Sequence, residues 1–79
     1  MTDTSYAILN YLKEYNGSTA KVISEALEIE KRRVDSCFSA AIAGADLGYR
    51  DRSVTPSRLF LNEKGMEYTQ YKVVQEFDF

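Results

Sequence analysis

The sequence predicts a mostly α-helical domain with one small β-hairpin, an α+β fold, and three observations support this class. Apolar residues recur at helical spacing in three successive segments before residue 46. After Gly48 the spacing changes to the alternation typical of strands. The stretch "SVTPS" (53–57) then separates two short strand-like runs, as a hairpin turn does. A last helical pattern follows, so the expected order is α-α-α-β-β-α.

The first helix is expected over 4–15. Asp3 or Thr4 can cap its start, and Asn16-Gly17 is a stop signal because both residues tolerate a left-handed backbone. The residues at helical spacing are Ser5, Ile8, Leu9, Leu12 and Tyr15.

The second helix is expected over 19–27, capped by Ser18 or Thr19, and the third over 31–45. The apolar stripe of the second contains Val22, Ile23, Ala26 and Leu27. The stripe of the third contains Val34, Phe38, Ala41, Ile42 and Ala45.

The hairpin is expected near 49–60. Pro56 belongs in its turn, because proline cannot donate to a strand ladder. Asn62 can cap a last helix over about 62–77. With 79 residues, the chain is expected to form a single domain, 1–79.

The composition argues against an enzyme. The chain has no histidine, so the commonest general base is missing. A single cysteine without histidine forms neither a thiol dyad nor a Cys/His metal set, so no metal or cofactor is expected. Cys37 lies among apolar residues and is expected to be a small buried side chain; a reactive thiol is the alternative.

The lone cysteine fits a reducing compartment, and the sequence contains no apolar run of roughly 18–20 residues. We expect no signal peptide, because the start Met1-Thr2-Asp3-Thr4 has no basic region and no apolar core. We therefore expect a cytoplasmic protein without a membrane segment. The net charge of −2 gives no global attraction for nucleic acid, so any nucleic-acid surface must be a local basic patch.

The segment "STAKVISEALEIEKRRVDSCF" (18–38) resembles the helix-turn-helix of winged-helix regulators of the MarR and PadR type. Ala26-Leu27 would end the first helix of that motif, Ile29 would fill its turn, and Val34 and Phe38 would point inward from the recognition helix. "LGYRDR…RLFLNEKG" is similar to the wing and the following helix start. The resemblance implies a winged helix-turn-helix fold and DNA binding, with a recognition helix near 31–45 and a wing near 49–60.

The bases on these segments are the candidate DNA-binding residues. Arginine can contact guanine through two hydrogen bonds, and either basic side chain can bind phosphate. Arg50 and Arg52 are expected on one strand face, where their charges add. The full set is Lys31, Arg32, Arg33, Ser36, Arg50, Arg52 and Arg58. The alternative is an ordinary solvated helix start and a charged edge strand.

Tyrosines cluster in the first and last helices, and tyrosine is enriched at interfaces. The expected homodimer interface contains Tyr6, Tyr11, Tyr68, Tyr71 and Phe77. The alternative is that these helices pack on each other within one chain.

Two functions follow as hypotheses. The first is a small transcriptional regulator that binds duplex DNA as a homodimer. The second is a winged-helix module that binds protein, an acidic adaptor or inhibitor without DNA binding. Glu30 at the start of the third helix and the small residues Ser36, Ser39, Ala40 and Ala43 favour the second.

Overall fold

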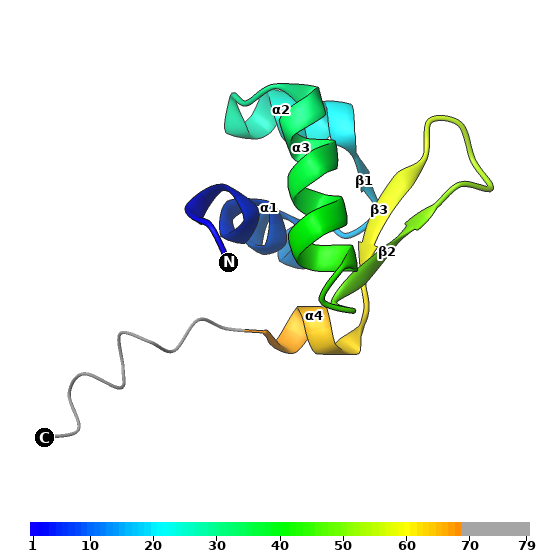
Figure 1. The fold of residues 1–79 in the computed structure, drawn as a ribbon. Coiled ribbons are helices and arrows are strands. Elements are labelled where there is room, and N and C mark those ends of the chain that lie inside the picture. The colour runs from blue at the N-terminus through cyan, green and yellow to red at the C-terminus, as the bar shows by residue number, and fades with distance from the viewer. Residues whose placement is uncertain (69–79) are drawn as a thin grey trace, which may run out of the picture.

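A computed structural model describes residues 1–68, in which helices pack with a small three-stranded antiparallel sheet (Figure 1). This confirms the α+β class at a coarse level. The elements are α1 (Asp3–Glu14), β1 (Ser18–Thr19), α2 (Ala20–Leu27), α3 (Lys31–Cys37), η1 (Phe38–Ala43), β2 (Gly48–Asp51), β3 (Arg58–Leu61) and α4 (Glu63–Glu67).

Helix α1 begins one residue earlier than the sequence indicates, because its cap is Thr2 rather than Asp3 or Thr4. The Thr2 Oγ1 accepts a hydrogen bond from the backbone N–H of Ser5 at 3.2 Å. Asp3 instead lies in the first turn, where its negative charge suits the helix dipole. The buried side of α1 contains Ser5, Ile8, Leu9 and Leu12.

Helices α2 and α3 are joined by a tight turn. Thr19 caps α2, since its Oγ1 accepts from Val22 N at 3.2 Å. Glu28 ends α2 in the left-handed conformation (φ 57°, ψ 46°), and the N–H of Ile29 bonds back to the Ser24 carbonyl at 3.0 Å. Ile29 is half-buried against the core, as expected for an apolar residue in this turn.

The third predicted helix has two parts. The α-helical part, α3, continues directly into the π-helical η1, whose wider turn places the N–H of Gly44 3.0 Å from the Ser39 carbonyl. The two parts together end at Ala43, two residues before the predicted end at 45. Ala45, predicted on the apolar stripe, is exposed.

The sheet has the strand order β1-β3-β2, so the predicted hairpin of β2 and β3 gains a third strand. Arg50 lies opposite Leu59, and Asp51 opposite Arg58. Strand β1, which the sequence did not predict, pairs Ser18 with Leu59. Pro56 lies in the connection between β2 and β3, as predicted.

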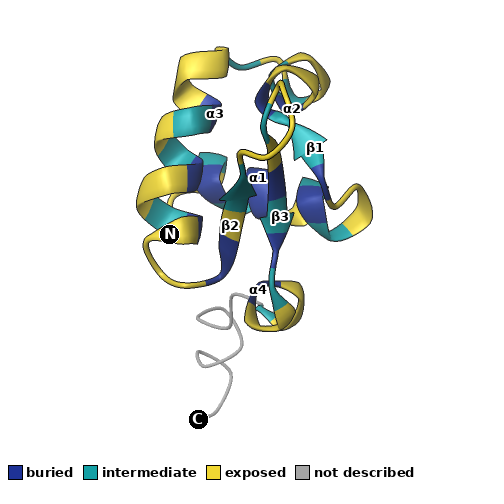
Figure 2. Ribbon diagram, turned by 90° about the vertical axis from the view of Figure 1, so that its right-hand side faces the viewer, coloured by how far each residue is buried: buried dark blue, intermediate teal, exposed yellow. Residues whose placement is uncertain are grey.

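The core lies between the sheet and the helices. Figure 2 views the sheet with α1 behind it and α3 beside it. Each fully buried aliphatic side chain contributes about 1.5–3 kcal/mol by leaving water. The core contains Ile8, Leu9, Leu12, Ala20, Ile23, Val34, Phe38, Ile42, Leu47, Leu59 and Leu61. Val22, predicted on the apolar stripe of α2, is instead 44% exposed.

Helix α4 is shorter than predicted. Asn62 caps it as expected, its Oδ1 accepting from Gly65 N at 2.8 Å. The prediction of a helix over 62–77 is correct for Glu63–Glu67 but wrong at Tyr68, which is extended (φ −65°, ψ 130°). Residues 69–77 of that prediction lie outside the described residues. Within residues 1–68, no helix has the length and apolar character needed to cross a bilayer.

Candidate nucleic-acid interface

The candidate interface is the surface where α3 faces the β2–β3 hairpin. The start of α3 and the tip of the hairpin lie toward the same end of the molecule, and α4 lies at the opposite end (Figure 1). The sequence-predicted DNA-binding residues come from these two elements, and the structure divides them into three groups.

The first group is exposed on α3. Val34 and Phe38 turn into the core and thereby fix the face that α3 shows to solvent. Arg32, Arg33 and Ser36 are all exposed on the remaining circumference. Within the described part of the chain, neither guanidinium forms an ion pair. These two charges are therefore available to a ligand.

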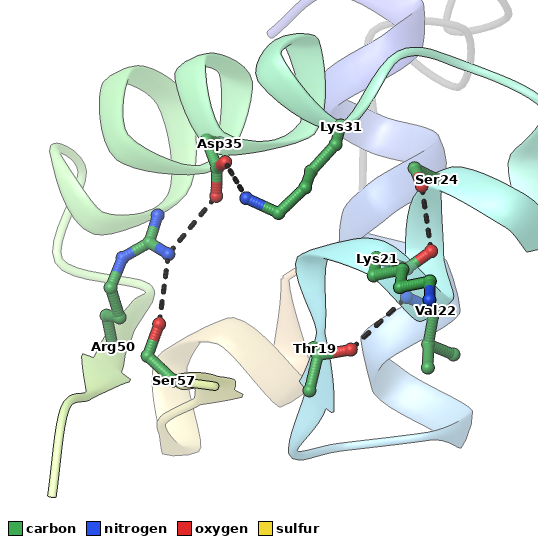
Figure 3. A network of polar contacts seen from close by, with 8 residues as sticks. All are labelled: Thr19, Lys21, Val22, Ser24, Lys31, Asp35, Arg50 and Ser57. Atoms are coloured by element: carbon green, nitrogen blue, oxygen red, sulfur yellow. Dashed lines mark hydrogen bonds and ion pairs between the residues drawn. The ribbon is translucent and has the colours of Figure 1, made fainter. Parts of the chain in front are cut away.

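The second group is tied to Asp35, a residue that sequence reasoning did not assign to the site. Lys31 Nζ lies 3.1 Å from Asp35 Oδ2, and Arg50 Nη1 lies 3.2 Å from Asp35 Oδ1 (Figure 3). The same Arg50 nitrogen lies 3.5 Å from Ser57 Oγ. One carboxylate thus bridges a base on α3 and a base on β2.

Arg50 is the more firmly held of the two bases. Its side chain is 18% exposed, against 61% for Lys31. The guanidinium carbon lies 5.8 Å from the centroid of the Phe38 ring, within the range of a cation–π contact. Arg50 therefore joins α3 to the hairpin and presents little of its charge to solvent.

The third group, Arg52 and Arg58, is placed differently from the prediction. Strand β2 ends at Asp51, so Arg52 lies beyond it and does not share a strand face with Arg50. Arg58 is the register partner of Asp51, whereas Arg50 is the partner of buried Leu59. Because neighbouring residues in a strand alternate between faces, Arg58 lies on the sheet face away from Arg50. The predicted additive Arg50–Arg52 pair is therefore wrong.

Asp51 helps to order the start of the hairpin turn. The Ser53 hydroxyl and backbone N–H donate to Asp51 Oδ1 at 2.6 and 2.9 Å. These two hydrogen bonds, with a smaller contribution from the Arg58 charge, hold the pKa of Asp51 below its ordinary value. Asp51 is consequently an ionised residue at neutral pH, close to Arg52 and Arg58.

Glu30 also adds negative charge near the start of α3. It occupies the cap position, but its side chain accepts no capping hydrogen bond and is exposed. Its carbonyl oxygen accepts from Arg33 N at 3.0 Å and Val34 N at 3.1 Å. The exposed bases at the start of α3 thus lie between two carboxylates in the sequence, Glu30 before them and Asp35 after them.

The outer face of the sheet carries an aromatic pair that the sequence analysis missed. Tyr49, 53% exposed, stacks on Phe60 with ring centroids 5.4 Å apart. The sequence did contain a signal for this pair, because Tyr49 and Phe60 alternate with the buried residues of their strands and therefore belong to the opposite face of the sheet. Next to this face, a surface cavity of about 330 Å³ is lined in part by Tyr15, Val22 and Arg58.

The predicted dimer tyrosines contact residues of their own chain. Tyr6 packs edge-on against Tyr68 with centroids 6.4 Å apart, and Lys13 Nζ donates to the Tyr68 carbonyl. The ring centroids of Tyr11 and Tyr15 lie 4.8 Å apart. The side chains of Tyr6, Tyr11 and Tyr68 are all half-buried against the core. This is the intrachain packing that the sequence left open as the alternative. Tyr71 and Phe77 lie outside the described residues.

Cys37 is half-buried and packs against the core, so it is less enclosed than predicted.

Comparisons of the chain with protein-family models, with curated proteins and with solved structures found no match.

Proposed function

We propose that this chain is a winged helix-turn-helix domain that binds duplex DNA through α3 and the β2–β3 hairpin. The order α1-β1-α2-α3-β2-β3 and the strand order β1-β3-β2 support this fold, together with the tight turn between α2 and α3. In this arrangement α3 enters the major groove and the hairpin contacts the flanking backbone.

The observation that carries the proposal is a pair of exposed guanidiniums on the first turn of α3 that have no ion-pair partner among residues 1–68. Arg32 and Arg33 are exposed, and neither forms an ion pair with a described residue. Arg52 adds a third exposed charge at the start of the hairpin connection, and the tip of the hairpin lies toward the same end of the molecule as the start of α3 (Figure 1). Arginine at such positions can read guanine or bind phosphate.

The test measures binding of a fluorescent random duplex at low salt by anisotropy. We expect Arg32→Gln and Arg33→Gln each to weaken binding by about fivefold or more, as the loss of a phosphate or base contact does. Lys64→Gln removes the same charge from α4, at the other end of the molecule, and is expected to leave affinity nearly unchanged. Equal losses in all three variants would show that general charge, rather than this site, attracts DNA.

Homodimerisation is part of this proposal. The three exposed arginines Arg32, Arg33 and Arg52 give one copy few phosphate contacts, and a second copy related by a two-fold axis doubles them. Light scattering of the protein alone and with a two-site duplex measures the stoichiometry. A one-to-one complex on such a duplex would exclude the dimer.

A protein-binding module is the second candidate, and the outer sheet face favours it. Tyr49 is exposed and stacked on Phe60, and the neighbouring cavity exposes Tyr15 and Val22. Exposed apolar residues gathered in this way are typical of a protein-contacting surface. Tyr49→Ser changes the outer sheet face alone, because Tyr49 lies away from α3. DNA binding through α3 is therefore expected to survive this change, whereas binding of a protein to the outer sheet face is not. If wild-type protein fails to bind any duplex at low salt, the protein-binding candidate replaces the first.

A further inference from the structure

We propose that Asp35 is an internal competitor of the DNA backbone: its carboxylate occupies Lys31 and Arg50 as a phosphate would, and so limits sequence-independent binding. The inference rests on the proposed function and concerns regulation of the same site. It is carried by the contacts of one carboxylate with bases from two different elements (Figure 3).

Each oxygen of Asp35 has a base of its own. Oδ1 lies 3.2 Å from Arg50 Nη1, and Oδ2 lies 3.1 Å from Lys31 Nζ. A phosphate group presents oxygens of similar geometry and charge, and basic side chains bind carboxylate and phosphate by the same charge-assisted hydrogen bonds. The carboxylate therefore takes the place that a backbone phosphate would occupy between α3 and the hairpin.

The two bases are held to different degrees. Arg50 also contacts Ser57 and the Phe38 ring, so its guanidinium would have to break several contacts in order to bind DNA. Lys31 is 61% exposed and has Asp35 as its single ion-pair partner among the described residues. Exposed pairs of this kind are weak, so Lys31 is the base that loss of the Asp35 charge would release first.

A phosphate that reaches either base must approach the Asp35 carboxylate closely, and the two negative charges repel each other. The repulsion does not depend on DNA sequence, because every phosphate carries the same charge. Asp35 consequently weakens backbone binding near Lys31 and Arg50 while leaving Arg32 free on the neighbouring surface. Binding by the remaining arginines then depends more strongly on the bases they contact.

Asp35→Asn tests this idea, because an amide oxygen can still accept from Arg50 while the negative charge is removed. We expect the variant to bind random duplex about tenfold more tightly at low salt, from the loss of a nearby like charge together with the release of Lys31 to a phosphate. We also expect the slope of log affinity against log salt to steepen by about one, since Lys31 becomes available to a phosphate. Glu63→Gln, which removes an exposed carboxylate from α4, is the charge-matched control and should change affinity by less than about twofold.

Lys31→Gln gives a second measurement, which as a single change does not depend on the folding of the Asp35 variant. In the wild-type background it should weaken binding by about twofold or less, whereas combined with Asp35→Asn it should remove most of the gain. The inference would be overturned if Lys31→Gln alone abolished DNA binding. It would also be overturned if Asp35→Asn, shown to be folded by circular dichroism, bound DNA with wild-type affinity. Failure of the wild-type protein to bind any duplex at low salt would instead overturn the proposed function itself.

Discussion

Charge partners decide which basic residues remain available to a ligand. The Lys31–Asp35 pair follows from their i, i+4 spacing on a helix, which can be read from the sequence. The Asp35–Arg50 pair cannot be read in this way, because it depends on the strand register and on how the hairpin packs beside α3. For this reason the sequence placed Arg50 among the DNA-binding residues, whereas the structure places it between α3 and the hairpin.

Gly17 is a residue at which the backbone demands glycine. Its φ of +90° is a conformation that other residues rarely adopt, and an added Cβ would lie 2.9 Å from Phe60 Cε1. We expect Gly17→Ala to lower the free energy of unfolding by about 1–3 kcal/mol, because it adds backbone strain and displaces the Phe60 ring. Urea denaturation measures this loss.

Ser36→Ala is the matched control for that prediction, since Ser36 is exposed on a helix and its change should stay within about 0.5 kcal/mol. Similar stability of the two variants would mean that the turn before β1 tolerates a side chain.

Local signals in the sequence were sufficient for the elements that carry their own caps and turns. Thr19, Asn62 and Pro56 stand where the sequence predicted them. Strand β1 was missed because two residues have no measurable periodicity, and its pairing partner lies in β3, far along the chain. The π-helical η1 was missed for a related reason, since its residues have an ordinary helical pattern and only the backbone hydrogen bond from Gly44 N to the Ser39 carbonyl reveals the wider turn.

Asn62 joins two elements with one side chain, and its two functions can be separated. Its Oδ1 caps α4 through Gly65 N, and its Nδ2 donates to the Asp46 carbonyl, each at 2.8 Å. We expect Asn62→Ala to reduce the free energy of unfolding by about 1–2 kcal/mol, the usual cost of a lost cap plus a hydrogen bond. Asn62→Asp keeps the cap and loses the donor, so its loss should be smaller. Equal losses in both variants would assign the effect to the Asp46 contact alone.

At the scale of the whole molecule, a net charge of −2 coexists with three exposed arginines at the start of α3 and in the hairpin connection, two segments that lie toward one end (Figure 1). The overall charge could be read from the sequence, but the distribution of the bases required the fold. Lys64 pairs with Asp46 at 3.6 Å near the opposite end, and Arg58 lies on the outer sheet face beside Asp51. The proposed interface is thus a local patch rather than one face of a basic protein.

This distribution sets the expected salt dependence. If Arg32, Arg33 and Arg52 each displace one counterion, log affinity for random duplex should fall with log salt at a slope of about −2.7 for one copy and about twice that for two copies bound together. Anisotropy titrations between low and moderate salt measure the slope, and light scattering of the same complexes gives the number of copies. A slope near zero would contradict phosphate binding by these arginines. A slope near the doubled value in a one-to-one complex would show that bases which the structure holds in ion pairs, Lys31 and Arg50 first among them, also reach the backbone.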